Sequence, residues 1–172
     1  MPQVSKESVS AFEAHDHTHC AGHAMSRAEG VIAAQKLRLT PVRRRVLEIL
    51  LEEHRAMGAY EVLERLAEEG FGKQPPVAYR ALDFLVDCGL VHRIRRLNAF
   101  IACLHAGEDH APVFLICETC DAVAEAPGAA VRAELDKSAL GVGFRVDRAS
   151  IEAVGLCPRC AQKPEKETTK DV

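Results

Sequence analysis

The chain has 172 residues, a formal net charge of −3 and 48% hydrophobic residues. This length suits one medium domain or two small ones, and the composition allows a buried core. No apolar stretch approaches the ~18 residues that cross a bilayer, and the N-terminus lacks the apolar region of a secretion signal. We therefore expect a cytoplasmic protein with no membrane partner, whose seven cysteines serve metal or redox sites rather than disulfides.

Charge is distributed unevenly along the chain. Residues 25–100 carry 13 basic and 10 acidic side chains, whereas residues 101–172 carry 8 basic and 12 acidic ones. A mildly basic region followed by an acidic region favours a nucleic-acid-facing half and a second half with a different role.

Two polar segments flank the rest of the chain. Residues 1–24 show no amphipathic period and are predicted to be a flexible arm, and residues 161–172 are predicted to be a flexible tail. Five side chains of the arm either bind a further metal ion or are simply solvated. They are His15, His17, His19, Cys20 and His23.

Helices are predicted at four places between the two flanking segments. The first is predicted to start at Ser26 and the second at Thr40-Pro41. The third runs from about Ala59 to Glu69, and the fourth from about Val77 to Cys88. Thr40 suits the N-cap and Pro41 the first helical position. Gly70 and Gly89 follow the third and fourth helices, where glycine commonly ends a helix.

Extended runs follow the helices. Leu90–Ile94 and Ala99–Leu104 are predicted strands joined by a turn near Asn98, so the helices and this hairpin together predict a winged helix-turn-helix. Beyond about Cys103 the pattern changes to a small α/β half. Its predicted elements are strands at Val113–Ile116 and Ala122–Ala126, a helix at Gly128–Leu140, and strands with a break within Phe144–Val154. The fold class is therefore α+β.

Two CxxC pairs give the strongest motif. Cys117 and Cys120 form the first pair, and Cys157 and Cys160 form the second after a gap of 36 residues. A CxxC turn presents two thiolates at a bite that suits a tetrahedral metal, and Zn²⁺ matches four sulfur ligands. We expect a closed structural zinc site with no open position for catalysis, although two unrelated redox pairs would give the same pattern.

The predicted fourth helix carries candidate DNA contacts. Tyr79 and Arg80 lie in its first turns, where a recognition helix meets base edges: arginine can bond guanine, and tyrosine can contact a phosphate or a thymine methyl group. Arg93, Arg95 and Arg96 in the hairpin would contact phosphates, and a further basic cluster, Arg43 to Arg45, lies at the start of the second helix. A solvated basic face on an ordinary helical protein is the alternative.

Several of these segments together resemble the ferric uptake regulator family of bacterial metalloregulators. The resemblance covers about residues 26–160 and rests on Leu39–Arg43, Pro75–Leu82 and the paired CxxC motifs. Within the family the chain is most similar to the zinc uptake regulator branch, in Tyr79–Leu85, Gly89–His92 and Gly155–Cys157. The chain departs from the usual pattern in two places: Val42 replaces a glutamine, and Val77-Ala78 replaces Thr-Val.

The resemblance implies a homodimer that binds a palindromic, A·T-rich operator in double-stranded DNA. It implies a winged-helix DNA-binding domain over residues 25–97 and a hinge and dimerisation domain, holding the structural zinc, over residues 98–160. By matching positions, Tyr60 and Arg80 would contact the operator.

A second metal site is also implied. His92, Cys103, His110 and Glu125 are spaced like the sensing ligands of the zinc branch, and one thiolate, two imidazoles and one carboxylate suit tetrahedral Zn²⁺. Two zinc ions per chain are thus expected. His105 could replace one of these ligands, His92 could be solvated, and Cys103 could be a core residue.

The sequence therefore predicts a zinc-responsive repressor of zinc uptake genes with no catalytic residues and no small-molecule substrate. The alternative within the family is a sensor of iron, manganese or peroxide. The thiolate ligand disfavours iron and manganese, and the nitrogen and oxygen ligands expected of a peroxide sensor are not assembled here. A zinc hydrolase would need an open water position with a general base, and no HExxH or nucleophile motif is present. A zinc-stabilised interaction module that does not bind DNA is the third alternative.

Overall fold

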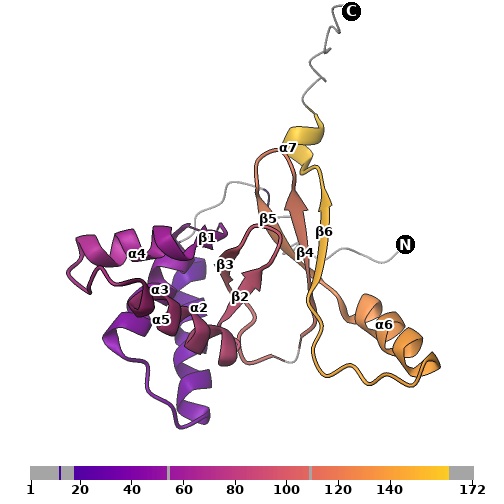
Figure 1. The fold of residues 1–172 in the computed structure, drawn as a ribbon, viewed down its shortest axis with the longest axis horizontal. Coiled ribbons are helices and arrows are strands. Elements are labelled where there is room, and N and C mark those ends of the chain that lie inside the picture. The colour runs from indigo at the N-terminus through magenta and orange to yellow at the C-terminus, as the bar shows by residue number, and fades with distance from the viewer. Residues whose placement is uncertain (1–11, 13–17, 54, 109, 163–172) are drawn as a thin grey trace, which may run out of the picture.

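The computed structural model describes residue 12 and residues 18–53, 55–108 and 110–162, which form a helical half and a sheet half (Figure 1). The helical half contains α2 (Thr18–Ala34), α3 (Pro41–Glu53), β1 (Met57–Gly58), α4 (Ala59–Glu68), α5 (Pro75–Asp87), β2 (Val91–Ile94) and β3 (Ala99–Ala102). The sheet half contains β4 (Pro112–Cys117), β5 (Val123–Pro127), α6 (Ala129–Gly141), β6 (Ile151–Gly155) and α7 (Pro158–Ala161). The mixed helix and strand content confirms the predicted fold class.

An aliphatic core holds the helical half together. The helix α3 packs against α2, α4 and α5, because its apolar side chains recur at helical spacing and face inward. Pro41 is the first residue of α3, as predicted, and Gly70 and Gly89 adopt positive φ just past α4 and α5. Side chains that are no more than 1% exposed come from α3, α4 and α5: Val46, Ile49, Leu50, Val62, Leu66, Leu82 and Leu85.

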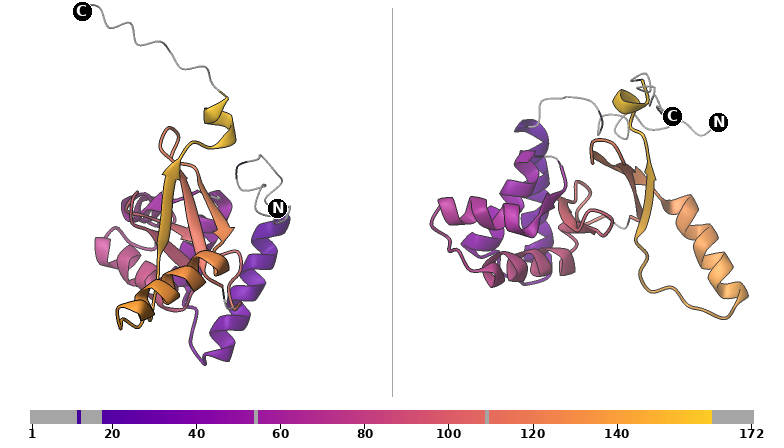
Figure 2. Two further views of the ribbon diagram at one scale, coloured as in Figure 1. Left: turned by 90° about the vertical axis from the view of Figure 1, so that its right-hand side faces the viewer. Right: turned by 45° about the horizontal axis from the view of Figure 1, so that its top comes forward.

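Two small sheets complete the fold. The first has the order β1-β3-β2 and is antiparallel throughout, with Val91 opposite Ala102 and Ile94 opposite Ala99. The second has the order β5-β4-β6, in which β4 pairs antiparallel with β5 and parallel with β6. The helix α6 provides most of the crossover between β4–β5 and β6 and extends away from the helical half (Figures 1 and 2).

An apolar seam joins the two halves. Ile94 of β2 is buried with Phe114 and Ile116 of β4 and Val123 of β5, and Ala56, Leu97 and Ile101 pack around them. The β2–β3 hairpin therefore lies against the sheet of the other half, which places residues 91–103 and 110–125 beside one another.

The structure differs from the sequence prediction at several boundaries. The helix predicted to start at Ser26, which is α2, begins at Thr18 instead, so the predicted arm is helical from residue 18. His15 and His17 lie outside the described residues, as does the predicted tail beyond residue 162. The short strand β1 and the helix α7 were not predicted, and in the Phe144–Val154 region β6 is the one strand described. Among the described residues, no helix is long and apolar enough to span a membrane.

Candidate metal centres and nucleic-acid interface

The four-cysteine site lies at one end of the second sheet. Cys117 ends β4, Cys120 follows in the turn to β5, and Cys157 and Cys160 follow β6. Because β4 and β6 run parallel, both CxxC turns emerge at the same edge, and the four sulfur atoms lie within 4.8 Å of one another. The Sγ atoms of Cys120 and Cys157 are 3.8 Å apart. The 36-residue gap in the sequence is thus closed by parallel pairing.

Backbone N–H groups prepare this site for thiolates. Hydrogen bonds from the backbone of Cys157, and then of Thr119 and Cys120, lower the pKa of the Cys117 thiol to about 6. The pKa of Cys160 instead rises to about 12, first because of its hydrogen bond to Cys157. Several thiolates this close together need a cation to balance their charge, and four sulfurs with no open position fit a structural zinc ion.

The mixed site, defined by His92, Cys103, His110 and Glu125, lies between the two halves. One ligand atom from each of the four side chains lies within 4.8 Å of the others, so the structure brings together all four predicted residues. His92 is on β2, Cys103 directly follows β3, His110 lies in the linking segment of residues 103–111, and Glu125 is on β5. Three chain segments and both halves therefore contribute to it.

His110 is oriented as a metal ligand would be. Its Nδ1–H donates to the backbone carbonyl of Glu108 at 2.9 Å, which leaves Nε2 free to act as a ligand. The Nε2 atom lies 3.4 Å from the Cys103 Sγ and 3.4 Å from the Glu125 Oε1. A hydrogen bond that fixes the tautomer of a ligating histidine is common at metal sites.

The other two members show why the site calls for a cation. Burial lowers the pKa of His92 and so favours the neutral imidazole. Its Nε2 is a buried atom with no hydrogen-bond partner among the described residues. Burial, followed by the nearby Glu125 carboxylate, raises the pKa of the Cys103 thiol to about 12. An unsatisfied buried nitrogen and a thiol beside a carboxylate are both stabilised by one divalent metal ion.

His105 lies just outside the mixed site. Its Nδ1 is 3.4 Å from the Glu125 Oε1, and its ring is tilted against that of His110 at 5.8 Å between centroids. The side chain is 42% exposed, whereas that of Glu125 is 14% exposed. His105 therefore contacts Glu125 but is not one of the four residues of the mixed site.

The candidate DNA contacts cluster on one side of the helical half. Tyr60, at the start of α4, and Tyr79, in the second turn of α5, are 64% and 39% exposed. Their rings meet edge to face at 6.4 Å between centroids, and Arg80 is exposed beside Tyr79. The structure thus brings Tyr60, Tyr79 and Arg80 onto neighbouring turns of two helices.

The basic cluster at the start of α3 makes contacts within the helical half. Arg45 bonds Glu52 and Glu69, Arg44 bonds Glu29, and the Arg43 guanidinium lies 3.5 Å over the Phe84 ring. Each arginine of the cluster therefore has a partner within the helical half. The reason is that helical spacing turns these side chains toward α2, α4 and α5.

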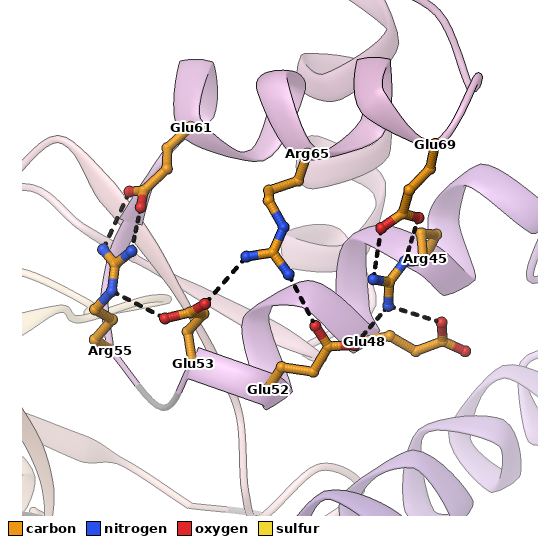
Figure 3. Close-up of polar contacts among 8 residues, drawn as sticks. All are labelled: Arg45, Glu48, Glu52, Glu53, Arg55, Glu61, Arg65 and Glu69. Atoms are coloured by element: carbon orange, nitrogen blue, oxygen red, sulfur yellow. Dashed lines mark hydrogen bonds and ion pairs between the residues drawn. The ribbon is translucent and has the colours of Figure 1, made fainter.

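An ion-pair network ties α3 to α4 (Figure 3). Arg65 reaches Glu52 and Glu53 of α3, and Arg55 reaches Glu53 and Glu61. Glu61 is in the first turn of α4, next to Tyr60. The network consequently holds the start of α4, and with it the Tyr60 backbone, against α3.

Comparisons with known proteins agree with this architecture. Residues 34–154 match the Ferric uptake regulator family. The chain is 35% identical over 139 residues to the zinc uptake regulation protein of Escherichia coli (strain K12), covering 80% of this chain and 81% of that protein. The chain belongs to the ferric uptake regulator family.

Solved structures within and around this family are also similar. A zinc uptake regulator complexed with zinc and DNA is 34% identical, has a TM-score of 0.78, and is matched over 82% of this chain and 95% of its own. The holo form of XcZur is 36% identical with a TM-score of 0.67, over 78% of this chain and 98% of its own. The Francisella tularensis ferric uptake regulator with iron shares the fold at 18% identity and a TM-score of 0.53, over 73% of this chain and 96% of its own.

Two residues at the mixed site of this family member do not stand out in its sequence. Glu108 orients His110 through its backbone carbonyl and bonds Arg27 of α2 through its side chain. Phe114 packs its ring 5.1 Å from that of His92. Backbone acceptors and packing contacts of this kind carry no motif, so only the folded chain shows them.

Proposed function

We propose that the chain is a zinc-responsive transcriptional repressor that binds operator DNA as a homodimer in the cytoplasm and controls zinc uptake genes. One observation carries the proposal: the mixed site takes ligands from both the helical half and the sheet half. A site placed in this way can link metal binding to the relative orientation of the halves. The similarity to a zinc uptake regulator complexed with zinc and DNA supports the proposal that this chain binds both zinc and DNA.

The donor set favours zinc over the alternatives. A thiolate, two imidazoles and a carboxylate match the tetrahedral N, S and O coordination of Zn²⁺, whereas iron and manganese sensors should prefer nitrogen and oxygen ligands alone. The four-cysteine site would hold a second zinc ion, so each chain would bind two. His92, Cys103, His110 and Glu125 would hold the regulatory ion, and Cys117, Cys120, Cys157 and Cys160 the structural one.

The helical half has the parts of a winged-helix DNA reader. The helices α4 and α5 would form the helix-turn-helix, with α5 as the recognition helix and the β2–β3 hairpin as the wing. Arg80 would bond a base edge, and Tyr60 and Tyr79 would contact the backbone or thymine methyl groups. Arg80 has no hydrogen bond or ion pair within the part of the chain that the structure describes, which fits a role outside the monomer.

The sheet half has a surface suited to a second copy of the chain. The strand β6 lies at the edge of its sheet, and α6 contains no buried residue. Large apolar side chains are exposed on and around these elements, and such a surface favours a protein partner. They are Val131, Leu135, Leu140, Val142, Phe144, Val154 and Leu156.

Regulation would follow from the position of the mixed site. The four side chains of the mixed site would hold one divalent cation between them. His92 belongs to the half that carries α5, and Glu125 belongs to the sheet half, so a common bond would fix the angle between the halves. A dimer must place two recognition helices in successive major grooves about 34 Å apart, which few orientations allow. Zinc would act by population shift toward those orientations.

The proposal is tested by fluorescence anisotropy on the promoter of a zinc-uptake operon across buffered free zinc. Affinity should rise steeply with zinc and should not respond comparably to buffered iron(II) or manganese(II). A response to iron(II) or manganese(II) alone would reassign the metal. Flat binding would leave a DNA-binding protein with structural metal only.

Substituting Arg80 separates a DNA reader from an interaction module. The Arg80→Ala variant should lose about 1–3 kcal/mol of binding free energy if the side chain bonds a base. Because the side chain is exposed, the variant should keep its fold and both zinc ions. If the wild-type protein itself does not bind DNA, the result would support the alternative of a zinc-stabilised interaction module.

A further inference from the structure

A single carboxylate from the sheet half holds the turn of the β2–β3 hairpin. Glu152 of β6 accepts a hydrogen bond from the backbone N–H of Arg95 at 2.7 Å through Oε1, and one from Arg96 at 2.9 Å through Oε2. The partners are 57 and 56 residues apart in the chain. Both oxygens of one charged group thus bind successive backbone donors across the boundary between the halves, which makes these hydrogen bonds stronger than neutral ones.

Sheet register places Glu152 and the mixed site in one row. Phe114 of β4 pairs with Glu125 of β5 on one side and with Glu152 of β6 on the other. Side chains of laterally paired residues point to the same face of a sheet. Glu125 and Glu152 therefore face the β2–β3 hairpin together, on either side of Phe114.

The length of this row matches the length of the hairpin strand that lies over it. Two interstrand spacings of about 4.8 Å span about 10 Å, and three residues of extended chain also span about 10 Å. His92 and Arg95 are three residues apart on and just after β2. The hairpin is thus attached at two points, His92 beside Glu125 and Arg95 beside Glu152, with Phe114 packed on His92 between them.

We propose that Glu152 is a positioning residue that holds the β2–β3 hairpin against the sheet without metal and so sets how much zinc the mixed site needs. This inference rests on the proposed function. Hydrogen bonds to Arg95 and Arg96, together with the apolar seam around Ile94 and Phe114, favour the closed orientation before zinc binds. Zinc then has a smaller conformational free energy to supply, because the binding-competent state is already partly populated.

The first experiment measures the free zinc concentration that gives half-maximal DNA binding. We expect Glu152→Ala to raise this midpoint about tenfold, within the usual range of coupling between sites. Affinity at saturating zinc should stay close to that of the wild type. Glu152→Gln removes the same charge but keeps one acceptor oxygen, so its shift should be smaller. Lower midpoints in both variants would instead indicate that removing a negative charge strengthens DNA binding, and would overturn the proposal.

Asp147→Ala provides a matched control. Asp147 is exposed, lies five residues before Glu152, and pairs with its neighbour Arg145, so its removal should leave the midpoint unchanged. If the wild type shows no zinc response, the proposed function fails. If the wild type responds and Glu152→Ala matches it, only the inference about Glu152 fails.

A second experiment tests whether the contact between Glu152 and the hairpin forms without zinc. This experiment does not involve DNA. Hydrogen exchange at the Arg95 and Arg96 amides should be slow in a Cys103→Ser variant, whose mixed site is disabled. Adding Glu152→Ala to that variant should make both amides exchange at the rate of an open turn. Fast exchange of these amides in the single variant Cys103→Ser, with protection only in the zinc-bound wild type, would contradict the proposal. It would show that the Glu152 contact forms only after zinc binds.

Discussion

The two clusters of metal-binding side chains differ in how the chain builds them. The four-cysteine site lies wholly within the sheet half, from two local CxxC turns whose backbone N–H groups already stabilise a thiolate. The mixed site takes ligands from three segments across two halves. It contains a buried nitrogen that has no hydrogen-bond partner in the described part of the chain, and a thiol whose pKa is about 12. Metal binding at a site confined to one half can only stabilise that half. Metal binding at a site shared between the halves can change how the two halves are oriented relative to each other.

The largest effect should come from breaking the four-cysteine site. Cys117→Ser removes a ligand whose site would contribute directly to folding, so the variant should lose its tightly held zinc and unfold at lower temperature. A loss of several kcal/mol corresponds to about 10 °C or more for a chain of this size. Calorimetry and metal analysis would measure both. An unchanged melting temperature with one zinc ion lost would show that this site does not stabilise the sheet half.

Removing a ligand of the mixed site should change the stability of the fold little but should strongly reduce the effect of zinc on DNA affinity. Cys103→Ser should abolish the rise in DNA affinity with zinc, a loss on the order of 10- to 100-fold at saturating zinc. The dimer and the tightly held zinc should remain, which sedimentation and metal analysis would verify. A variant that stayed fully zinc-responsive would remove the mixed site from the mechanism.

His105 tests where the mixed site ends. Because its Nδ1 approaches Glu125 without entering the quartet, His105→Ala should weaken zinc affinity by about tenfold while keeping four ligands. Replacing zinc with cobalt(II) should give the same tetrahedral absorption spectrum in the variant and the wild type. A changed spectrum would make His105 a ligand, and His110→Ala would provide the comparison for a true ligand loss.

The smallest effect concerns the ion-pair network, which holds its charges without metal. Hydrogen bonding to Arg55 lowers the pKa of Glu61 below its ordinary 4.5, so the pair stabilises the fold fully above that pH and less as pH falls through the lowered value. Arg55→Ala should cost less than about 1 kcal/mol, because both side chains are well exposed. Thermal unfolding at pH 7 should show the difference, and at pH 3 the difference should shrink. A difference that grew in acid would contradict the assignment.

Sequence patterns predicted what depends on local spacing. The CxxC pairs, the Thr40-Pro41 start and the glycines after α4 and α5 are local, and the structure places each as expected. The four mixed-site residues came from spacing like that of a known family, and the fold brings them together. Contacts between distant segments could not be predicted in this way. The partners of Arg45 and Glu152 depend on how helices and strands pack, so neither set of contacts was predicted.

The parallel pairing of β4 and β6 has a consequence for how the strands are aligned. Side chains alternate between faces along a strand, so a slip of one residue would turn Glu152 to the opposite side of the sheet. The same slip would displace Cys157 and Cys160 by about 3.3 Å along the strand direction, away from Cys117 and Cys120. Four sulfur atoms closed around one ion tolerate no such displacement. The four-cysteine site would therefore fix the alignment of β4 and β6, and with it the orientation of the side chains that face the helical half.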